Sequence, residues 1–448
     1  MGKLFGTFGV RGIANEEIDP SFAYKLGLSF ASCLKEGSVV AVGMDTRTSS
    51  EMLKCAAVSG LLAGGVEVID LGVVPTPTVQ FACRHFRTDG GLMVTASHNP
   101  AEYNGIKLLA PEGVGLQRAD DARIEDVYFS EKFRRVSWDR IRPVRKENIL
   151  PTYIKELMAN IDSSIIRKKS PKVVVDCGSG AGCLLTPQVL RELGCRVVSL
   201  NAQPDGFFPG RNPEPLPENL GGLMQAVVAT GADIGVALDG DADRCVTVDE
   251  KGSVVWGDKT FALVAADMLK AEKGLVVSSV ATSHLVKETA EKNGGSYEAT
   301  RVGELVIAKV LLDKKGLLGG EENGGLIFPG FTLGREGTLT AAKIIEVLCK
   351  SGMKFSELVD SLPKFYQTKT KVRGPMEKVG QVLSKIKLEG KIDRTDGLKA
   401  VFDDGSWVII RPSGTEPLMR VFTEARTQQR AEELKSKYSK MVESLLNS

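Results

Sequence analysis

The sequence has few histidines and no paired cysteines. Only three histidines occur in 448 residues, and the eight cysteines form no C-x-x-C pair. They are scattered at positions 33, 55, 83, 177, 183, 195, 245 and 349. This spacing argues against both a zinc site and a disulfide framework. We expect reduced thiols that are mostly buried.

A strong charge of one sign and a long apolar run are also missing. The chain has 58 basic and 56 acidic residues, and its net charge of +2 is too small for a general nucleic-acid binder. It has no apolar run of about 18 residues and no signal-peptide stretch near the N-terminus. We therefore expect a soluble, cytoplasmic protein with neither nucleic acid nor membrane as a partner. The densest basic run, residues 132–148, should be a solvated connector.

The length of 448 residues suits three or four domains better than one core. Short β-rich runs alternate with segments of helical length, which indicates α/β layers with parallel or mixed sheets. Only the last stretch differs, because its strands follow one another across a turn. The prediction is three similar α/β domains at residues 1–148, 149–250 and 251–363, followed by an α+β domain at 364–448.

Periodicity gives the individual elements. In the first domain it predicts strands at 38–45, 66–72 and 91–97 and helices at 21–35, 50–65 and 78–86. Later helices are predicted near 184–193, 220–230, 338–351, 376–387 and 430–446. The sequence TSH at 282–284 predicts a helix N-cap at Ser283.

The segment TASHNPAEYNGIK, residues 95–107, places a serine beside a histidine. That pairing suggests a hydrolase. However, Ala96 and His98 flank Ser97, so the G-x-S-x-G elbow of many hydrolases is missing. The usual hydrolase signature is therefore absent.

Three aspartates alternate in DGDADR after an apolar strand: Asp239, Asp241 and Asp243. Three crowded carboxylates repel one another unless a cation joins them, and Mg²⁺ prefers carboxylate oxygen. Glu250 stands where the last ligand of an EF-hand would be, but the glycine of that loop is missing. We predict a magnesium site, with an acidic hairpin turn as the alternative.

Two later loops carry groups suited to a sugar phosphate. RPSGTEPLMR, residues 411–420, combines two arginines with hydroxyls and a glycine, which suits a phosphate group better than a plain surface turn. GGEENGGLIF, residues 319–328, offers carboxylates and an amide that could bind sugar hydroxyls, although this signal alone is weak. GSGAG at 178–182 hints at a dinucleotide loop, but the spacing fails at Cys183.

Taken together, TASHNP, DGDADR, GEENGG and RPSGTEP occur in this order, and FGTFGVRGI precedes them. On these motifs the chain resembles the α-D-phosphohexomutase family over its whole length, and especially the archaeal phosphomannomutase/phosphoglucomutase type. The resemblance implies four domains around an active site in the central cleft. It also implies that the enzyme interconverts hexose 1-phosphate and hexose 6-phosphate, with mannose or glucose as the sugar.

The same resemblance implies roles for single residues. Ser97 would carry a phosphoryl group and share one Mg²⁺ per subunit with the three aspartates. Lys107 would act as general acid and base, and His98 would assist it. Arg244 would steady the phosphoserine, and Arg11 would lie nearby.

Substrate binding is implied in the same way. Glu321 and Asn323 would hold sugar hydroxyls. The phosphate that stays in place would be clamped by Arg411, Ser413, Gly414, Thr415 and Arg420. A hexose 1,6-bisphosphate would be the activator, the last domain would close over the substrate, and the protein would be a monomer or homodimer.

Two departures from bacterial relatives bear on sugar specificity. Some have histidine where this chain has Gly325, and some have tyrosine where it has Phe8. Phosphoglucosamine mutase is therefore the main alternative within the family. A metal-dependent phosphatase and a non-catalytic sugar-phosphate sensor are the alternatives outside it.

Overall fold

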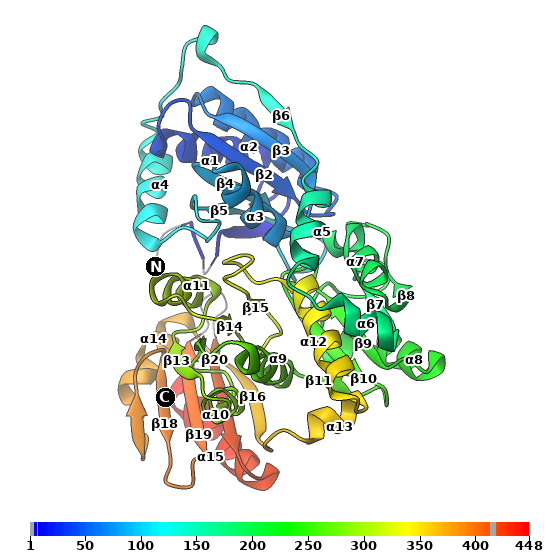
Figure 1. The fold of residues 1–448 in the computed structure, drawn as a ribbon. Helices are drawn as coiled ribbons and strands as arrows, with labels where there is room; N and C mark the ends of the chain where they lie inside the picture. The colour runs from blue at the N-terminus through cyan, green and yellow to red at the C-terminus, as the bar shows by residue number, and fades with distance from the viewer. Residues whose placement is uncertain (1–3, 7, 413–417, 448) are drawn as a thin grey trace.

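The computed structural model describes residues 4–6, 8–412 and 418–447. Four sheets, each with its own covering helices, follow one another along the chain (Figure 1). Three sheets contain parallel pairs and the fourth is antiparallel, so the predicted fold class is confirmed. Among the described residues, no helix combines the length and apolar character needed to cross a membrane.

The first sheet is mixed, and its strand order is β1-β5-β4-β2-β3-β6. Its strands are β1 (Val10–Ile13), β2 (Val39–Met44), β3 (Glu67–Val73), β4 (Gly90–Val94), β5 (Tyr103–Leu109) and β6 (Val144–Lys146). Its helices are α1 (Pro20–Cys33), α2 (Ser50–Ala63), α3 (Thr76–Phe86) and α4 (Arg118–Ser130). The basic run is more than a connector, because β6 pairs in parallel with β3 while its side chains stay exposed.

The second sheet has the order β11-β10-β9-β7-β8. Its strands are β7 (Lys172–Asp176), β8 (Arg196–Leu200), β9 (Ile234–Leu238), β10 (Cys245–Asp249) and β11 (Val254–Val255), with helices α5 (Leu150–Met158), α6 (Ser163–Lys169), α7 (Thr186–Leu193) and α8 (Gly221–Thr230). β9 and β10 are antiparallel, and the DGDADR segment connects them. The aspartate loop is therefore a strand connection at one edge of the parallel part of the sheet.

The third sheet has the order β13-β12-β14-β15. Its strands are β12 (Leu275–Ser279), β13 (Ser296–Thr300), β14 (Leu318–Gly320) and β15 (Leu326–Ile327), with helices α9 (Gly257–Ala271), α10 (His284–Lys292), α11 (Glu304–Lys314), α12 (Gly337–Ser351) and α13 (Phe355–Asp360). The predicted N-cap is confirmed, because Ser283 Oγ accepts a hydrogen bond from Leu285 N at 3.0 Å.

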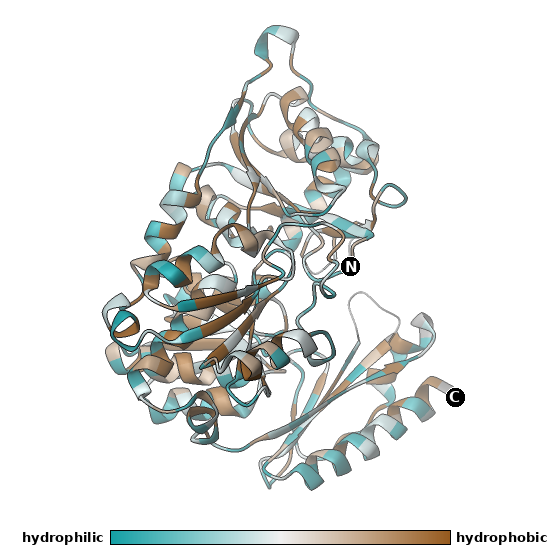
Figure 2. Cartoon of the chain, turned by 90° about the vertical axis from the view of Figure 1, so that its right-hand side faces the viewer, coloured by the Kyte–Doolittle hydropathy of each residue, from teal (hydrophilic) through white to brown (hydrophobic). Residues whose placement is uncertain are grey.

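The fourth sheet is wholly antiparallel, in the order β16-β20-β19-β18-β17. It contains β16 (Tyr366–Arg373), β17 (Lys391–Asp393), β18 (Leu398–Val401), β19 (Trp407–Pro412) and β20 (Leu418–Ala425), with helices α14 (Met376–Lys385) and α15 (Gln428–Asn447). Figure 2 shows this domain as a sheet with the C-terminal helix along one side.

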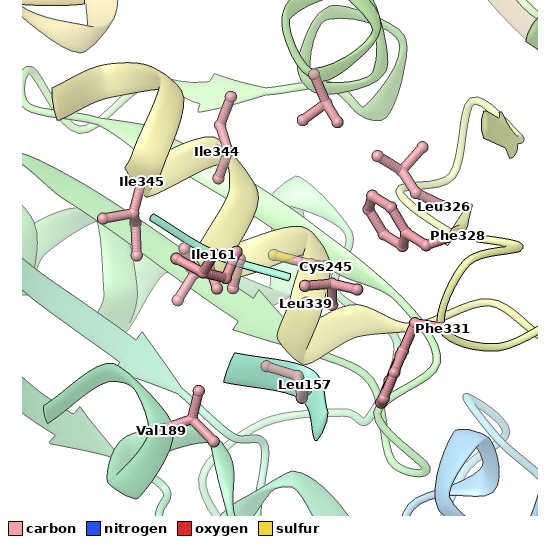
Figure 3. Packing of buried hydrophobic residues seen from close by; sticks show 14 of the residues in the cluster. Leu157, Ile161, Val189, Cys245, Leu326, Phe328, Phe331, Leu339, Ile344 and Ile345 are labelled. Carbon is pink, nitrogen blue, oxygen red and sulfur yellow. The ribbon is translucent and has the colours of Figure 1, made fainter. Parts of the chain in front are cut away.

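The apolar cores explain how the four units are joined. One cluster continues through the first three units, and in Figure 3 Leu157 and Ile161 lie with Leu339 and Ile345 of α12 in that cluster. The fourth unit has a core of its own. It meets the third unit through a small cluster that includes Val280 and Trp407. The first three units therefore form one packed body, and the fourth is attached at its side.

Candidate active site

Ser97 lies in the turn between β4 and β5, where the chain reverses direction. The side chain is buried, and its backbone φ of +53° is left-handed. Ser97 Oγ donates a hydrogen bond to Asp239 Oδ2 at 3.1 Å and lies 3.3 Å from His98 Nδ1. The fold thus brings the serine of the first unit against the first aspartate of the second.

The three aspartates of DGDADR form a buried cluster, in which one carboxylate oxygen from each lies within 4.8 Å of the others. Buried polar atoms are normally hydrogen-bonded, yet Asp241 Oδ1 and Asp243 Oδ1 have no hydrogen-bond partner among the described residues. An ion pair does link Asp243 Oδ1 to Arg244, whose Nε lies 3.7 Å away. A set of oxygen donors with unused lone pairs fits a hard divalent cation such as Mg²⁺. The segment is a hairpin turn between β9 and β10, as in the alternative weighed from the sequence, but its carboxylates are buried rather than exposed to solvent.

Burial and the neighbouring charges shift the pKa values of these aspartates in different directions. Burial, followed by the charges of Asp243 and Asp241, holds the pKa of Asp239 well above its ordinary value. Burial alone would also raise the pKa of Asp241, but the charge and hydrogen bond of Lys107 hold that pKa below its ordinary value. The cluster without a cation therefore favours a proton on one carboxyl and a negative charge on another.

Lys107 extends from β5 into this cluster and is buried. Its Nζ donates to Asp241 Oδ2 at 2.7 Å and lies 3.7 Å from Asp243 Oδ2. The ordinary alternative for a lysine on a strand, a solvated surface position, is therefore excluded. Arg11 lies on the neighbouring strand β1 and donates to Asn99 Oδ1 at 2.9 Å.

His98 and Arg244 lie next to the serine. Arg244 Nη2 lies 3.1 Å from His98 Nδ1, and Arg244 Nε lies 3.8 Å from Asp239 Oδ2. Burial and then the charge of Arg244 lower the pKa of His98 well below its ordinary value, so the ring is neutral near pH 7.

The sugar-loop residues follow β14, beside this cluster. Glu321 is buried, and its Oε1 accepts a hydrogen bond from Gly303 N at 3.0 Å. Burial raises the pKa of Glu321, although the charge of Arg335 opposes the shift. Asn323 Oδ1 accepts from Gly325 N at 3.2 Å, so this side chain shapes its own turn.

Arg335 was missed by the sequence analysis. It is buried, and it lies 2.6 Å from Asp243, 3.2 Å from Glu304 and 3.4 Å from Glu321. These contacts join the aspartate loop to the sugar loop. The only signal in the sequence is a charged residue in the mostly apolar segment before α12, which does not reveal its partners.

The phosphate-loop arginines lie on neighbouring strands of the fourth sheet. Arg411 of β19 pairs in register with Arg420 of β20, so both extend from the same face of the sheet. Arg411 Nε lies 3.3 Å from Asp396 Oδ2. Ser413, Gly414 and Thr415 lie outside the described residues.

Comparison with known proteins decides the family. Four models for successive domains of phosphoglucomutase/phosphomannomutase match the chain: α/β/α domains I, II and III at residues 2–135, 151–252 and 256–366, and the C-terminal domain at 356–440. The chain belongs to the phosphoglucomutase/phosphomannomutase family. The resemblance inferred from the motifs is therefore confirmed.

Individual relatives agree with this family over nearly the whole chain. A phosphoglucomutase/phosphomannomutase of Thermococcus kodakarensis is 54% identical over 455 residues, with 100% of both chains covered. A probable phosphoglucosamine mutase of Methanobrevibacter smithii is 39% identical, with 98% of each chain covered. A crystal structure of a family protein from Burkholderia thailandensis superposes with a TM-score of 0.89 at 26% identity, covering 99% of this chain and 97% of that one. The chain is accordingly an enzyme, an isomerase that transfers a phosphoryl group within its substrate.

Proposed function

We propose that the chain is a phosphohexomutase that interconverts hexose 1-phosphate and hexose 6-phosphate, with mannose or glucose as the sugar. The observation that carries this function is the contact of Ser97 Oγ with Asp239 Oδ2 at 3.1 Å. It places a hydroxyl that can carry a phosphoryl group at the edge of three buried carboxylates. The Thermococcus relative, 54% identical and named for both sugars, supports this choice of substrates.

We assign Ser97, Asp239, Asp241 and Asp243 as the ligands of one Mg²⁺. Asp241 Oδ1 and Asp243 Oδ1, which accept no hydrogen bond from the described part of the chain, support this assignment. When bound, the cation supplies Lewis-acid stabilisation of the charge on the transferring phosphoryl group. The protein residues supply the rest, which is mainly positioning and exclusion of water.

The reaction consists of two phosphoryl transfers. In the first, the P–O bond to Ser97 breaks while a P–O bond to the free hydroxyl of the sugar phosphate forms, and that hydroxyl gives up its proton. Lys107 acts as the general base for this proton, and His98 assists it. The bisphosphorylated sugar then turns end for end, its other phosphate returns to Ser97, and Lys107 returns the proton to the oxygen left behind. A hexose 1,6-bisphosphate loads Ser97 and so acts as the activator.

The remaining residues bind the substrate in two orientations. Arg11 and Arg244 face the transferring phosphate, and Glu321 and Asn323 bind sugar hydroxyls. The clamp for the other phosphate comprises Arg411, Ser413, Gly414, Thr415 and Arg420. The paired register of Arg411 with Arg420 supports a bidentate clamp, because two guanidinium groups extend from one face of the sheet.

Phosphoglucosamine mutase is the second candidate, since the Methanobrevibacter relative bears that name at 39% identity. The buried carboxyl of Glu321 could face an ammonium group as well as a hydroxyl. The chemistry at Ser97 is the same in both cases, and only the sugar differs.

The test is ³¹P NMR of the purified protein with Mg²⁺ and a trace of glucose 1,6-bisphosphate. Mannose, glucose and glucosamine 1-phosphates are supplied in separate tubes. We expect a 6-phosphate signal to grow, fastest with mannose or glucose. Faster conversion of glucosamine 1-phosphate favours the second candidate. Release of inorganic phosphate alone indicates a phosphatase, and binding of the sugars without any conversion indicates a sensor.

A further inference from the structure

Ser97 adopts a backbone conformation that serine rarely occupies. Its φ of +53° lies in the left-handed region, where a side chain crowds its own carbonyl group. Such a conformation persists only where the surroundings hold it in place. The contacts that hold Ser97 are therefore candidates for control of where its hydroxyl points.

A closed ring of hydrogen bonds surrounds the Ser97 backbone. Ser97 N donates to Thr95 Oγ1 at 2.8 Å, and Thr95 Oγ1 donates to Asp45 Oδ2 at 2.6 Å. Arg47 Nε donates to the same Asp45 oxygen at 3.1 Å. Arg47 Nη2 then donates to Ser97 O at 3.0 Å, which closes the ring. The backbone N–H of Ser97 is thus linked through Thr95, and its carbonyl oxygen through Arg47, to the buried carboxylate of Asp45.

Arg47 also holds the rest of the serine loop. Its two terminal nitrogens donate to the carbonyl oxygens of Asn99 at 2.6 Å, Pro100 at 2.5 Å and Tyr103 at 2.8 Å. Together with its bonds to Asp45 and Ser97, these contacts use all five N–H donors of the guanidinium group. A lysine has three donors and no planar fork, so it cannot replace this pattern.

The ring also lies against the unit that carries the aspartates. The Phe208 ring centroid is 5.1 Å from the guanidinium carbon of Arg47, and Thr46 Oγ1 donates to Ser179 O at 3.0 Å. Gly206 packs so closely that a Cβ there would lie 2.3 Å from Thr48 N. The segment that holds Ser97 is thereby packed against, and hydrogen-bonded to, the second unit.

We propose that Thr95, Asp45 and Arg47 are positioning residues that aim Ser97 Oγ at the aspartate cluster. This inference rests on the proposed function. In the proposed function, none of the three residues contacts the substrate. They act by fixing the backbone of Ser97, and with it the direction of in-line phosphoryl transfer.

The primary test compares Thr95→Val with Thr95→Ser. Valine matches threonine in shape but removes both hydrogen bonds, whereas serine keeps the hydroxyl. We expect Thr95→Val to lower kcat on the order of 10- to 100-fold, because a small misplacement of a reacting group has an effect of that size. We expect KM for the hexose phosphate to stay within about twofold, because the substrate contacts are unchanged. Thr95→Ser should recover most of kcat.

A second comparison separates positioning from general stability. Arg134 binds carbonyl groups in the same manner but far from the serine, since it donates to Gly64 O at 3.0 Å, Leu34 O at 2.5 Å and Ala31 O at 2.6 Å. We expect Arg47→Lys to lower kcat and also the single-turnover rate of phosphoryl transfer from glucose 1,6-bisphosphate to Ser97. Arg134→Lys should lower the melting temperature and leave both rates unchanged.

The outcomes separate this inference from the proposed function. Wild-type kcat in Thr95→Val, or equal losses of kcat in Arg47→Lys and Arg134→Lys, overturns the inference alone. If Arg47→Lys does not fold, the isosteric Thr95→Val decides. A wild-type chain without mutase activity instead refutes the proposed function, and the inference with it.

Discussion

At the residue scale, the site depends on a few side chains that contact one another across two units. Ser97 comes from the first unit and the aspartates from the second, yet they meet through a direct hydrogen bond. Lys107 reaches the same cluster from β5. Because each group is buried, replacing one removes a buried hydrogen bond from its neighbour.

The first prediction concerns Ser97. Ser97→Ala should abolish turnover and leave hexose phosphate binding largely intact, because the variant removes the phosphoryl carrier and none of the clamp. Coupled assays and isothermal titration with glucose 6-phosphate measure the two effects. Ser283→Ala is the matched control, because that buried serine caps α10 and is not one of the proposed site residues; its loss should cost about 1 kcal/mol of stability without loss of turnover. Turnover in Ser97→Ala at the wild-type rate would refute the phosphoserine role.

The second prediction concerns the metal. Asp241→Asn removes one charge from the donor set and weakens the contact with Lys107. We expect both a lower maximal rate and a higher Mg²⁺ concentration for half-maximal activity, and chelation with EDTA should abolish the wild-type activity. A titration of rate against Mg²⁺ tests this. An unchanged titration curve removes Asp241 from the set of ligands.

At the element scale, a second buried Asp–Arg pair supports the aspartate loop. Arg211 Nε donates to Asp176 Oδ2 at 2.8 Å, at the end of β7. Arg211 Nη2 donates to Leu238 O at 2.6 Å, at the end of β9 and directly before Asp239. The pair thus joins the ends of two neighbouring strands where the proposed metal ligands begin.

The third prediction follows from that pair. Arg211→Lys should raise the Mg²⁺ concentration for half-maximal activity on the order of tenfold, the effect expected when the support of a metal ligand is lost. The same Mg²⁺ titration measures it. Arg191→Lys serves as control, because Arg191 is exposed and its Nη2 donates to Ser199 Oγ, away from the aspartate loop. Equal shifts in both variants contradict the role of Arg211.

The elements themselves were largely predictable. Apolar periodicity placed the helices, as in the predicted 338–351 against the observed Gly337–Ser351 and the predicted 430–446 against Gln428–Asn447. The predicted strand 91–97 was too long. It ends at Val94 because Ser97 turns into the left-handed region, which the residue types do not reveal.

The residues that the structure brings together in the candidate site could be predicted where they stand in a named motif, whereas the residues that contact and support them could not. Ser97, Lys107 and the aspartates stand in motifs with a recognisable chemistry. Arg47, Arg211 and Arg335 act through partners distant in the sequence, and a single sequence does not encode those pairings in any local pattern.

At the scale of the whole molecule, the fourth unit has its own core and meets the third through a small apolar cluster and hydrogen bonds. Glu424 of β20 accepts hydrogen bonds from His284 N at 3.0 Å and from Trp407 Nε1 at 2.7 Å. An attachment of this kind suits relative motion of domains. Closure of the last domain over the substrate stays a prediction, as do the four domain boundaries and a monomeric or homodimeric state.

The fourth prediction concerns pH and this junction. Burial raises the pKa of Asp258, at the start of α9, to about 7. Its folded pKa thus exceeds its unfolded value, so its contribution to stability is present at low pH and is lost as pH rises through about 7. Thermal denaturation at about pH 5 and about pH 8 should show a larger fall in melting temperature for the wild type than for Asp258→Asn. The Asn side chain can still accept the hydrogen bond from Ser283 N. Identical pH dependence in the two proteins contradicts the assignment.

The central claim is that Ser97 carries the phosphoryl group during turnover. The most direct test is intact-protein mass spectrometry after incubation with Mg²⁺ and glucose 1,6-bisphosphate, followed by peptide mapping. We expect a single added phosphoryl group on Ser97, which disappears when an excess of mannose 1-phosphate or glucose 1-phosphate is added and reappears in the sugar bisphosphate. Turnover without phosphate ever appearing on Ser97, or phosphate on another residue, contradicts the phosphoserine role of Ser97.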